Sequence, residues 1–347
     1  MLGGGVYVTQ NKVLPGAYIQ FVNASNVTST ISDRGIVAIA LPLGKAVGTV
    51  IEVNKADFVK NCNELLGKAY DSAEVKPLRE IFCNAQKVYV YDLGVDATQS
   101  VADVVAALEP YSFNVLCAYT GEASDVTAYI TAVTSWRDEL GKKCQIVVYN
   151  QSKPDYEGVI NVVSTVADEG ADAHALVAWV AGAEAGCAIN ASCTNMLYNG
   201  EYNIVANKTH AELTECIKNG QLAFHNVYGE IRVLEDINSL ITTKDDKGED
   251  FKNNQTIRVI DQIANDIARL FSTKYMGKIQ NNKSGRVSLW ADIVAHHKQL
   301  EAITAIENFD SALVTVEQGA TKKSVIITDA IQVVNSMSQL YMTVVIE

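Results

Sequence analysis

Between residues 36 and 190, short apolar runs alternate along the chain with longer amphipathic segments. The apolar runs have the length of strands, and the segments between them place apolar residues at helical spacing. The predicted strands cover residues 36–41, 87–93, 113–118, 144–149 and 159–163, and the predicted helices cover residues 55–67, 74–83, 100–109, 125–140 and 172–188. Strands that alternate with helices in this way predict an α/β domain with a mostly parallel sheet.

The predicted helix at residues 125–140 carries one apolar stripe. Val126, Ile130, Val133 and Leu140 recur along it at near-helical spacing. A stripe of this kind predicts a single buried face, so these four side chains are candidate core residues.

A third region, from about Cys193 onward, mixes strands and helices. Strand-like runs at residues 222–227 and 230–234 flank Tyr228-Gly229, and the polar stretch 242–254 is expected to be an exposed loop. One long helix then carries the apolar stripe Ile257, Ile260, Ile263, Ala264, Ile267, Leu270 and Phe271, and a second, at about residues 288–307, carries Leu289, Ile293, Leu300 and Ile303. Extended runs follow at residues 312–317, 324–328 and 340–346. The domain border near residue 190 is predicted from this change of pattern alone.

Both ends of the chain are strand-like. Val6 and Val8 alternate with polar neighbours, Pro15-Gly16 marks a turn, and residues 17–22 form a second extended run. A terminal strand must add to the edge of a sheet, either in its own subunit or in a neighbour. Pairing within the same subunit and exchange between subunits are both open from these residues.

Charge and cysteine usage narrow the class of protein. The 347 residues include 40 acidic and 28 basic side chains, a net charge of −12, which disfavours binding to nucleic acid or to anionic lipid. The longest apolar stretch, residues 173–189, contains His174 and Glu184 and is too short for a membrane span, and the N-terminus lacks a signal-peptide pattern. We therefore expect a soluble protein.

Its seven cysteines are expected to be buried, reduced thiols, since no C-x-x-C occurs: Cys62, Cys83, Cys117, Cys144, Cys187, Cys193 and Cys216.

Motifs of known enzyme classes are missing from the sequence. Residues 43–46 lack the glycine spacing and the hydroxyl of a P-loop, glycines 3–5 precede any strand–helix unit, and neither G-x-S-x-G nor H-E-x-x-H occurs. His296 and His297 are adjacent on a predicted helix and point about 100° apart, so we expect one solvated and one packed ring and no shared metal. The carboxylates of residues 242–254 lack EF-hand spacing and are expected to be solvated. No catalytic, cofactor-binding or metal-ligating residue is predicted.

Several segments resemble the tail sheath proteins of contractile phage tails. The run NKVLPGAYI at residues 11–19 is similar to the opening of the short sheaths of defective prophages and R-type bacteriocins. Further similar segments follow in order at residues 33–35, 87–93, 178–194, 257–267, 275–282 and 340–345. Their order and spacing carry the resemblance, which covers nearly the whole chain. Residues 331–335 (IQVVN) depart from it, since such sheaths often have proline there.

The resemblance implies a structural, non-enzymatic protein. Its expected fold is an α/β outer domain plus an α+β inner polymerisation domain, with extended N- and C-terminal strand arms. The expected division is an N-terminal arm at residues 1–25, the outer domain at 26–191, the inner domain at 192–339 and a C-terminal arm at 340–347. No Asp/His/Ser set has the context of a protease triad, so no protease activity is carried over.

The implied function is that of a contractile sheath subunit. Subunits would polymerise as stacked hexameric rings around the tail tube and contract from a metastable extended state to drive the tube through a target cell envelope. The implied partners are other copies of the chain, the tail tube protein, and baseplate and tail terminator proteins, with no cofactor, nucleic acid or membrane insertion. The implied location is a virion tail or a bacteriocin particle assembled in the bacterial host cytoplasm.

Two sets of contact residues are implied. Inter-subunit arm contacts are expected at Val6, Val8, Tyr18, Ile19, Leu340, Tyr341, Met342, Thr343, Val344, Val345 and Ile346. The basic stretch Lys274, Lys278, Lys283 and Arg286, with the helix at residues 287–308, is a candidate surface for an acidic tube, the alternative being an ordinary solvated helix face. The rival function is an α/β enzyme or small-ligand binder with its site at the carboxyl ends of the strands. A tail tube protein is disfavoured by the length of the chain.

Overall fold

A computed structural model describes residues 31–346 of the chain. The expected arm contacts Val6, Val8, Tyr18 and Ile19 therefore lie outside the described residues. The chain divides into two compact units, which we call the sheet unit (residues 32–265 with 333–347) and the small unit (residues 266–332 with 1–31). This division between residues 265 and 266 differs from the border that the sequence pattern suggested near residue 190, because β7 (Gln221–Leu222), which follows that border, pairs with β6 (Val159–Val162) in the sheet.

The sheet unit is built on one seven-stranded sheet with the order β2-β3-β1-β4-β5-β6-β7. The strands are β1 Ile36–Leu41, β2 Val50–Asn54, β3 Lys87–Asp92, β4 Val115–Cys117, β5 Gln145–Tyr149, β6 Val159–Val162 and β7 Gln221–Leu222. All neighbours are parallel except β2, which pairs antiparallel with β3 at one edge. The five predicted strands are confirmed, whereas the edge strand β2 was missed because its apolar residues are interrupted by Glu52.

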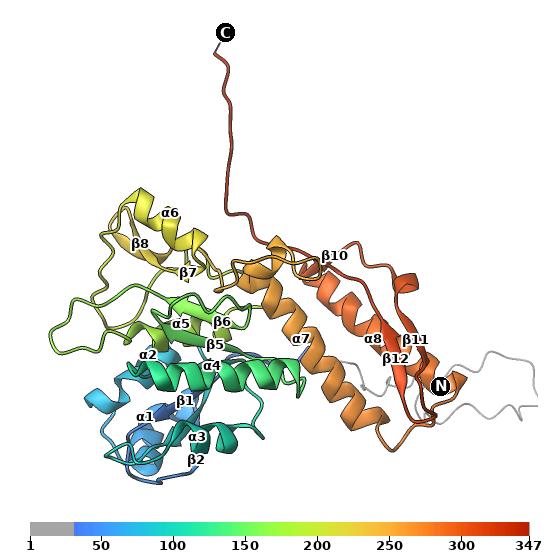
Figure 1. The fold of residues 1–347 in the computed structure, drawn as a ribbon, viewed down its shortest axis with the longest axis horizontal. Coiled ribbons are helices and arrows are strands. Elements are labelled where there is room, and N and C mark those ends of the chain that lie inside the picture. The colour runs from blue at the N-terminus through green and yellow to red at the C-terminus, as the bar shows by residue number, and fades with distance from the viewer. Residues whose placement is uncertain (1–30, 347) are drawn as a thin grey trace, which may run out of the picture. The chain divides into compact units, whose positions relative to one another are not determined.

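Helices cover both faces of this sheet (Figure 1). They are α1 Phe58–Asn61, α2 Lys76–Phe82, α3 Val101–Leu108, α4 Ala123–Asp138 and α5 Leu176–Gly186. Helix α6, His210–Lys218, contacts the edge strand β7. Side chains alternate along each strand, so Val37 and Ile39 of β1 pack with α1, α2 and α5, while Ala38 and Ala40 pack with α3 and α4. The result is a three-layer α/β/α arrangement, as the sequence predicted.

The apolar face of α4 differs in one residue from the predicted stripe. Val126 and Val133 are buried and Ile130 is partly buried, but Leu140 is 58% exposed because the helix ends at Asp138. Tyr129 and Trp136 complete the buried face instead. The prediction of Leu140 as a core residue was wrong.

A close helix contact fixes α5 on the sheet. Gly182 lies so near α2 that a Cβ atom would be 2.3 Å from the carbonyl oxygen of Ile81. Trp179, on the same helix, is fully buried, and its indole nitrogen donates to Asn199 Oδ1 at 2.8 Å. The Ala- and Gly-rich stretch is thus a buried core helix, as its composition indicated.

After α6 the chain forms a hairpin and a polar loop. Strands β8 Phe224–Val227 and β9 Glu230–Val233 pair antiparallel, and both turn residues, Tyr228 and Gly229, have positive φ. Positive φ at both central positions is the mark of a type I′ hairpin turn. The polar stretch that follows is mostly exposed, as expected, except that Asn254 at its end is buried.

Helix α7, Asn254–Leu270, runs from the sheet unit into the small unit. The small unit continues through a π-helical turn Phe271–Tyr275, helix α8 Lys283–Ala302, and strands β10 Ile306–Glu307, β11 Thr315–Gln318, β12 Val325–Thr328 and β13 Gln332–Val333. The strands β11 and β12 form an antiparallel pair, and β10 pairs with β13. Among the described residues of this unit, one buried apolar cluster comprises Tyr275, Leu289, Ile293, Val294 and Val314.

Both long helices depart from their predicted faces. Along α7, Ile257 is buried but Ile260 and Ile263 are only half-buried, while the polar Arg258 and Gln262 are buried. Helix α8 begins five residues before the predicted start and ends at Ala302, so Ile303 falls after the helix and is 36% exposed. Tertiary partners, not the apolar stripe alone, therefore decide which faces are covered.

Candidate functional site

The C-terminal segment, residues 334–346, is held at its base by one side chain of α7. The Gln255 amide donates from Nε2 to the Val334 carbonyl at 3.1 Å, and its Oε1 accepts from the Ser336 amide at 2.9 Å. Thr256 Oγ1 adds a 3.2 Å hydrogen bond to Asn335 Oδ1. The Gln255 side chain thus makes the two backbone hydrogen bonds that a neighbouring strand would make. The sequence around Gln255 contains no signal for this role, so the sequence analysis missed it.

Beyond this clamp the segment is apolar, extended and exposed. Leu340 is 85% exposed, Tyr341 88% and Ile346 92%, and the described residues of the segment form no strand. The same exposure holds for the other predicted arm contacts, Met342, Thr343, Val344 and Val345. Pairing of this run with a sheet of its own chain, one of the two alternatives from sequence, is therefore not what the described structure contains (Figure 1).

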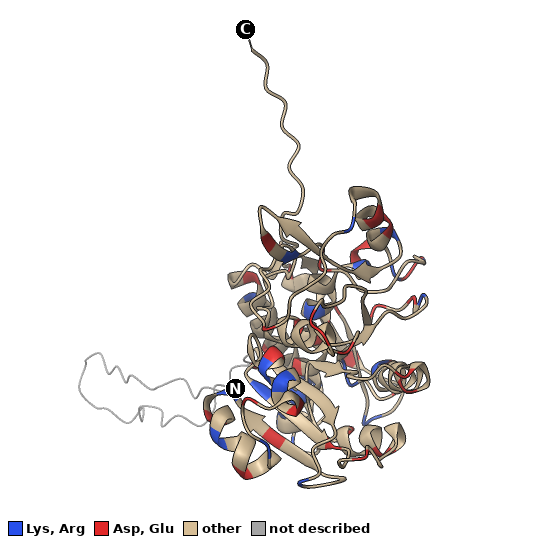
Figure 2. Cartoon of the chain, turned by 90° about the vertical axis from the view of Figure 1, so that its left-hand side faces the viewer, with Lys and Arg blue, Asp and Glu red and all other residues tan. Residues whose placement is uncertain are grey.

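The four predicted tube-facing residues differ in their surroundings. Lys274 Nζ is 2.6 Å from Asp292 Oδ2, and Lys278 Nζ donates to the Thr273 carbonyl at 2.6 Å. Lys283 and Arg286, in the first turn of α8, line an open cavity of about 460 Å³ together with Trp290, Val316 and Glu317 of the small unit. Figure 2 shows basic and acidic residues interspersed along the chain.

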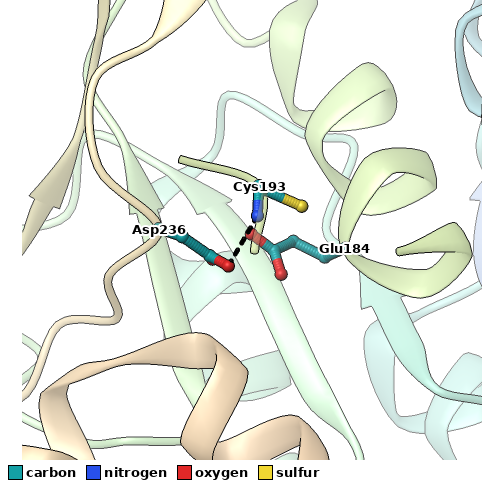
Figure 3. A group of neighbouring side chains, drawn as sticks. All are labelled: Glu184, Cys193 and Asp236. Atoms are coloured by element: carbon teal, nitrogen blue, oxygen red, sulfur yellow. Dashed lines mark hydrogen bonds between the residues drawn. The ribbon is translucent and has the colours of Figure 1, made fainter. Parts of the chain in front are cut away.

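A buried polar cluster joins α5, α7 and two loops of the sheet unit (Figure 3). The side chains of Glu184, Cys193 and Asp236 each offer one possible metal-ligating atom, and these three atoms lie within 4.8 Å of one another. The Arg258 guanidinium lies among them, however, 2.7 Å from Glu184 Oε2 and 3.3 Å from Asp236 Oδ2. The positive charge of this cluster is therefore supplied by arginine, and the arrangement is a buried ion-pair network.

The protonation of this network follows from its geometry. Burial raises the pKa of Asp236, but the Arg258 charge and hydrogen bonds from Glu184 and the Cys193 amide outweigh it, so its pKa lies below the ordinary range. Burial and the Asp236 charge raise the pKa of Glu184 well above its usual value. One guanidinium thus balances one carboxylate fully, while Glu184 tends to keep a proton that it shares with Asp236.

Arg34 extends the cluster toward the start of β1. Its guanidinium donates to the Glu184 carbonyl at 3.4 Å and to Gln262 Oε1 at 3.3 Å. Burial and the neighbouring Arg258 lower the pKa of Arg34 to about 10. The Asp33-Arg34-Gly35 segment therefore has a structural explanation, since Gly35 adopts a φ of 95° directly before the strand.

The cysteines are all free, and all are buried except Cys83, which is half-buried. Cys187 and Cys193 are hydrogen-bonded to each other, and this bond, with Arg258, lowers the pKa of Cys187 to about 7 despite burial. Buried, reduced thiols were expected, and the described structure agrees for six of the seven.

The prediction for the two adjacent histidines was wrong in one respect. His296 is 1% exposed and His297 is fully buried, so neither ring is solvated. Each Nε2 atom instead faces a carboxylate, Asp266 for His296 and Asp329 for His297.

The carboxyl ends of the strands, where the rival function would place a ligand, contain an internal anion. Strand β1 lies between β3 and β4, which makes its carboxyl end the position where doubly wound sheets bind ligands. There the buried Asp92 carboxylate accepts hydrogen bonds from the amides of Leu43, Gly44, Lys45, Ala46 and Gly94 at 2.7–3.2 Å. Burial raises the pKa of Asp92, yet these amide bonds prevail and lower it. The amides that could cradle a phosphate are thus engaged by a side chain of the protein.

Among the described residues, no helix combines the length and the apolar character that crossing a bilayer requires.

Two family models match the chain. Residues 94–239 match the phage tail sheath protein central domain, and residues 246–347 match the phage tail sheath C-terminal domain. The two matches together cover more than half of the chain and follow each other in the order of a sheath protein.

A curated relative supports the same assignment. The chain is 30% identical over 255 residues to the phage-like element PBSX protein XkdK of Bacillus subtilis strain 168. The matched region covers 70% of this chain and 54% of the relative. The chain spans little more than half the length of the curated relatives that it matches.

Solved structures share the fold at lower identity. The sheath tail protein from Desulfitobacterium hafniense has a TM-score of 0.78 and 24% identity, covering 94% of this chain and 99% of that one. The helical sheath of the anti-feeding prophage in its contracted state has a TM-score of 0.72 and 14% identity, covering 96% and 99%. The sequence models, the relative and the fold agree that this chain belongs to the phage tail sheath family.

Proposed function

We propose that this protein is the structural subunit of a contractile tail sheath. Its copies polymerise as stacked hexameric rings around a tail tube and contract from a metastable extended state to drive the tube through a target cell envelope. The particle is a virion tail or a bacteriocin, assembled in the host cytoplasm, and its further partners are baseplate and tail terminator proteins. The sheath has no catalytic activity of its own.

The observation that carries this proposal is the C-terminal segment. Residues 340–346 are all exposed and, except for Thr343, apolar, and they form no strand in the described structure, although the base of the segment is clamped by Gln255. A monomer that remained alone would expose these groups to water at a cost, and extended apolar segments of this kind add to sheet edges of other chains. The segment is thus suited to pair with a neighbouring subunit.

The acceptor for such a segment needs an open sheet edge. The pair β11–β12 has only two strands, so each strand has one edge without a partner among the described strands. A strand from another copy would continue this sheet through main-chain hydrogen bonds. Linkage of this type depends little on side-chain contacts, so subunits stay connected while their other surfaces exchange partners during contraction.

Contraction itself needs no nucleotide in this proposal. An extended sheath held behind a kinetic barrier can move its subunits as near-rigid bodies into a packing that buries more surface. The occupation of the strand-end amides by Asp92 supports a mechanism without bound phosphate, and favours the sheath over the rival ligand-binding function.

The tube contact is proposed for the start of α8. Lys283 and Arg286 line the open cavity of the small unit, whereas Lys274 is paired with Asp292 and Lys278 with a backbone carbonyl. An acidic tube surface would meet the first two residues most directly. This contact should weaken as salt rises, and binding of the tube that is insensitive to salt would contradict it.

The arm can be tested by electron microscopy of the full chain. Deleting residues 340–347 should abolish striated tubes and rings while the sheet unit stays folded by circular dichroism. Val344 and Val345 are each replaced by proline, which removes the backbone N–H, and by alanine, which keeps it. Two positions are needed because only one of two successive amides in a strand faces the partner strand. One proline variant should stop assembly and both alanine variants should permit it; normal tubes from the truncation would disprove the proposal.

A further inference from the structure

Two buried glutamines of α7 hold chain segments from opposite ends of the sequence. Gln255 bonds the main chain of residues 334–336, as described above. Further along the helix, Gln262 donates from Nε2 to the Ser32 carbonyl at 3.2 Å, and its Oε1 accepts from the Arg34 guanidinium at 3.3 Å. We call the two held segments the roots: the C-terminal root, residues 334–336, and the N-terminal root, residues 32–34.

Both glutamines lie on one face of α7. Seven residues separate Gln255 from Gln262, which is close to two helical turns and places them about 10 Å apart along the helix axis. Gln255 is 1% exposed and Gln262 is 4% exposed, so water competes little for their hydrogen bonds. Each amide uses both its oxygen and its nitrogen on a root. One helix face therefore holds both roots.

This part of α7 is fastened to the rest of the sheet unit by buried charges. Arg258, between the two glutamines, pairs with Glu184 of α5 and with Asp236. One turn later, Asp261 accepts two hydrogen bonds from Arg137 of α4, at 2.5 and 2.9 Å. Separating a buried ion pair leaves an uncompensated charge, so this stretch of helix moves with the sheet as one body. A pull on either root is thus passed to the sheet unit through α7.

The C-terminal root also limits how far the exposed segment can reach. Only residues 337–339 separate Ser336 from the apolar run at residues 340–346, and three extended residues span about 10 Å. Without the Gln255 contacts, the free tether would begin after Val333 and contain six residues, which span about 20 Å. The clamp therefore halves the distance over which a paired arm would let two copies of the chain separate.

We propose that Gln255 and Gln262 are positioning residues for assembly: they fix where the two ends of the chain leave the sheet unit, and so set the spacing between neighbouring copies. This inference rests on the sheath function proposed above. A short, fixed root lets a strand that has paired with another copy transmit the motion of one subunit to the next, whereas a long free tether would absorb that motion. Methionine has a similar volume but no amide, so it removes the hold at either position with little change in packing.

The C-terminal hold can be measured in the unaltered protein by amide hydrogen exchange at low concentration. After correction for intrinsic rates, the Ser336 amide, which is bonded to Gln255 Oε1, should exchange about tenfold more slowly than the amides of the exposed residues 338–341. Equal rates would overturn the clamp and the proposal with it. This measurement depends neither on polymerisation nor on the folding of any variant.

Spin labels at exposed positions test each root separately. The labels are attached to Asp33→Cys or to Met337→Cys, in a Cys83→Ser background that removes the half-buried native thiol. Gln262→Met should increase the rotational mobility of the label at residue 33 alone, and Gln255→Met that of the label at residue 337 alone. A label whose mobility does not respond to the loss of its own glutamine would overturn the assignment of that root.

Electron microscopy of the full-length variants connects the roots to assembly. With the fold retained by circular dichroism, Gln255→Met should lose tubes, or form tubes whose axial repeat varies more than in the wild type. Gln280→Met, at an exposed position, is the matched control and should form wild-type tubes. Regular tubes from a Gln255→Met variant with a mobile root would overturn the role in spacing. A wild type that forms no tubes would instead contradict the sheath function, while the exchange and label results still decide whether the roots are held.

Discussion

The sheet unit and the small unit bury their side chains very differently. In the sheet unit, two apolar clusters cover both faces of the sheet, and strands β1, β5 and β6 are almost wholly buried. In the small unit, the described apolar cluster has five buried members, and Leu300, Ala305 and Ile306 are buried outside it.

This contrast indicates which part of the molecule can be complete on its own. A sheet covered on both sides satisfies its apolar and backbone groups within one chain. A short hairpin over one helix, with exposed apolar side chains and an open edge, gains stability when other surfaces cover it. In our proposal the sheet unit is a self-sufficient body and the small unit reaches its full stability only in the assembled sheath.

The largest expected effect concerns the buried charges of the sheet unit. Replacing Arg258 by Met should cost about 3–5 kcal/mol of unfolding free energy, because Asp236 and Glu184 lose their buried counter-charge. The matched change in the small unit, Lys274→Met, removes a more exposed ion pair with Asp292 and should cost no more than about 1 kcal/mol. Urea unfolding followed by circular dichroism measures both, and equal costs would contradict the contrast between the units.

The next effect concerns Asp92 and depends on pH. Asp92→Asn should cost about 2 kcal/mol near pH 7, since the amides of the β1–β2 loop lose a charged acceptor. Because the pKa of Asp92 is lowered in the folded state, its stabilisation is present above about pH 4 and is lost as the pH falls through the folded-state value. The difference between wild type and variant should therefore shrink in acid.

Unfolding in urea at pH 7 and near pH 3 tests this dependence. The exposed Asp96, four residues along the chain, provides the matched control, and Asp96→Asn should change stability by less than about 0.5 kcal/mol. A cost of Asp92→Asn that is independent of pH would mean that the carboxylate charge is not what holds the loop.

The smallest effects compare one helix cap in each unit. Ser100 caps α3 of the sheet unit through the Asp103 amide, and Asn282 caps α8 of the small unit through the Gly285 amide at 2.8 Å. Either substitution by Ala should cost about 1 kcal/mol. Trp290 reports on the small unit, and a Trp290→Phe background leaves only tryptophans of the sheet unit. In urea unfolding followed by tryptophan fluorescence, we expect Asn282→Ala to shift only the transition that Trp290 reports. If both cap substitutions shift the transitions of both units equally, the units unfold as one.

Sequence periodicity predicted the sheet unit well. Strands β1, β3, β5 and β6 were located within two residues of their observed ends, because β1, β5 and β6 are largely apolar and almost wholly buried, and β3 alternates valine with tyrosine. The helices between them followed from their apolar spacing. The order of the resembling segments also predicted the family, which the two domain models confirm.

The sites were harder to predict. Glu184 was visible as an exception within an apolar stretch, whereas Arg258 is one of several polar residues in α7. Nothing near either residue indicated that the two would meet. The Gln255 clamp and the two histidine contacts were likewise missed. In each case the partners are separated by 30 or more residues in the sequence.

The amino-acid sequence by itself determined the strands, the core helices and the family, because burial of a local apolar pattern depends on residues a few positions apart. Only the tertiary structure decided that the polar face of α7 is buried, that Asp92 fills the strand-end amides and that His296 and His297 meet. A buried polar group is tolerated only where distant parts of the chain supply its partner, and that supply is a property of the folded molecule.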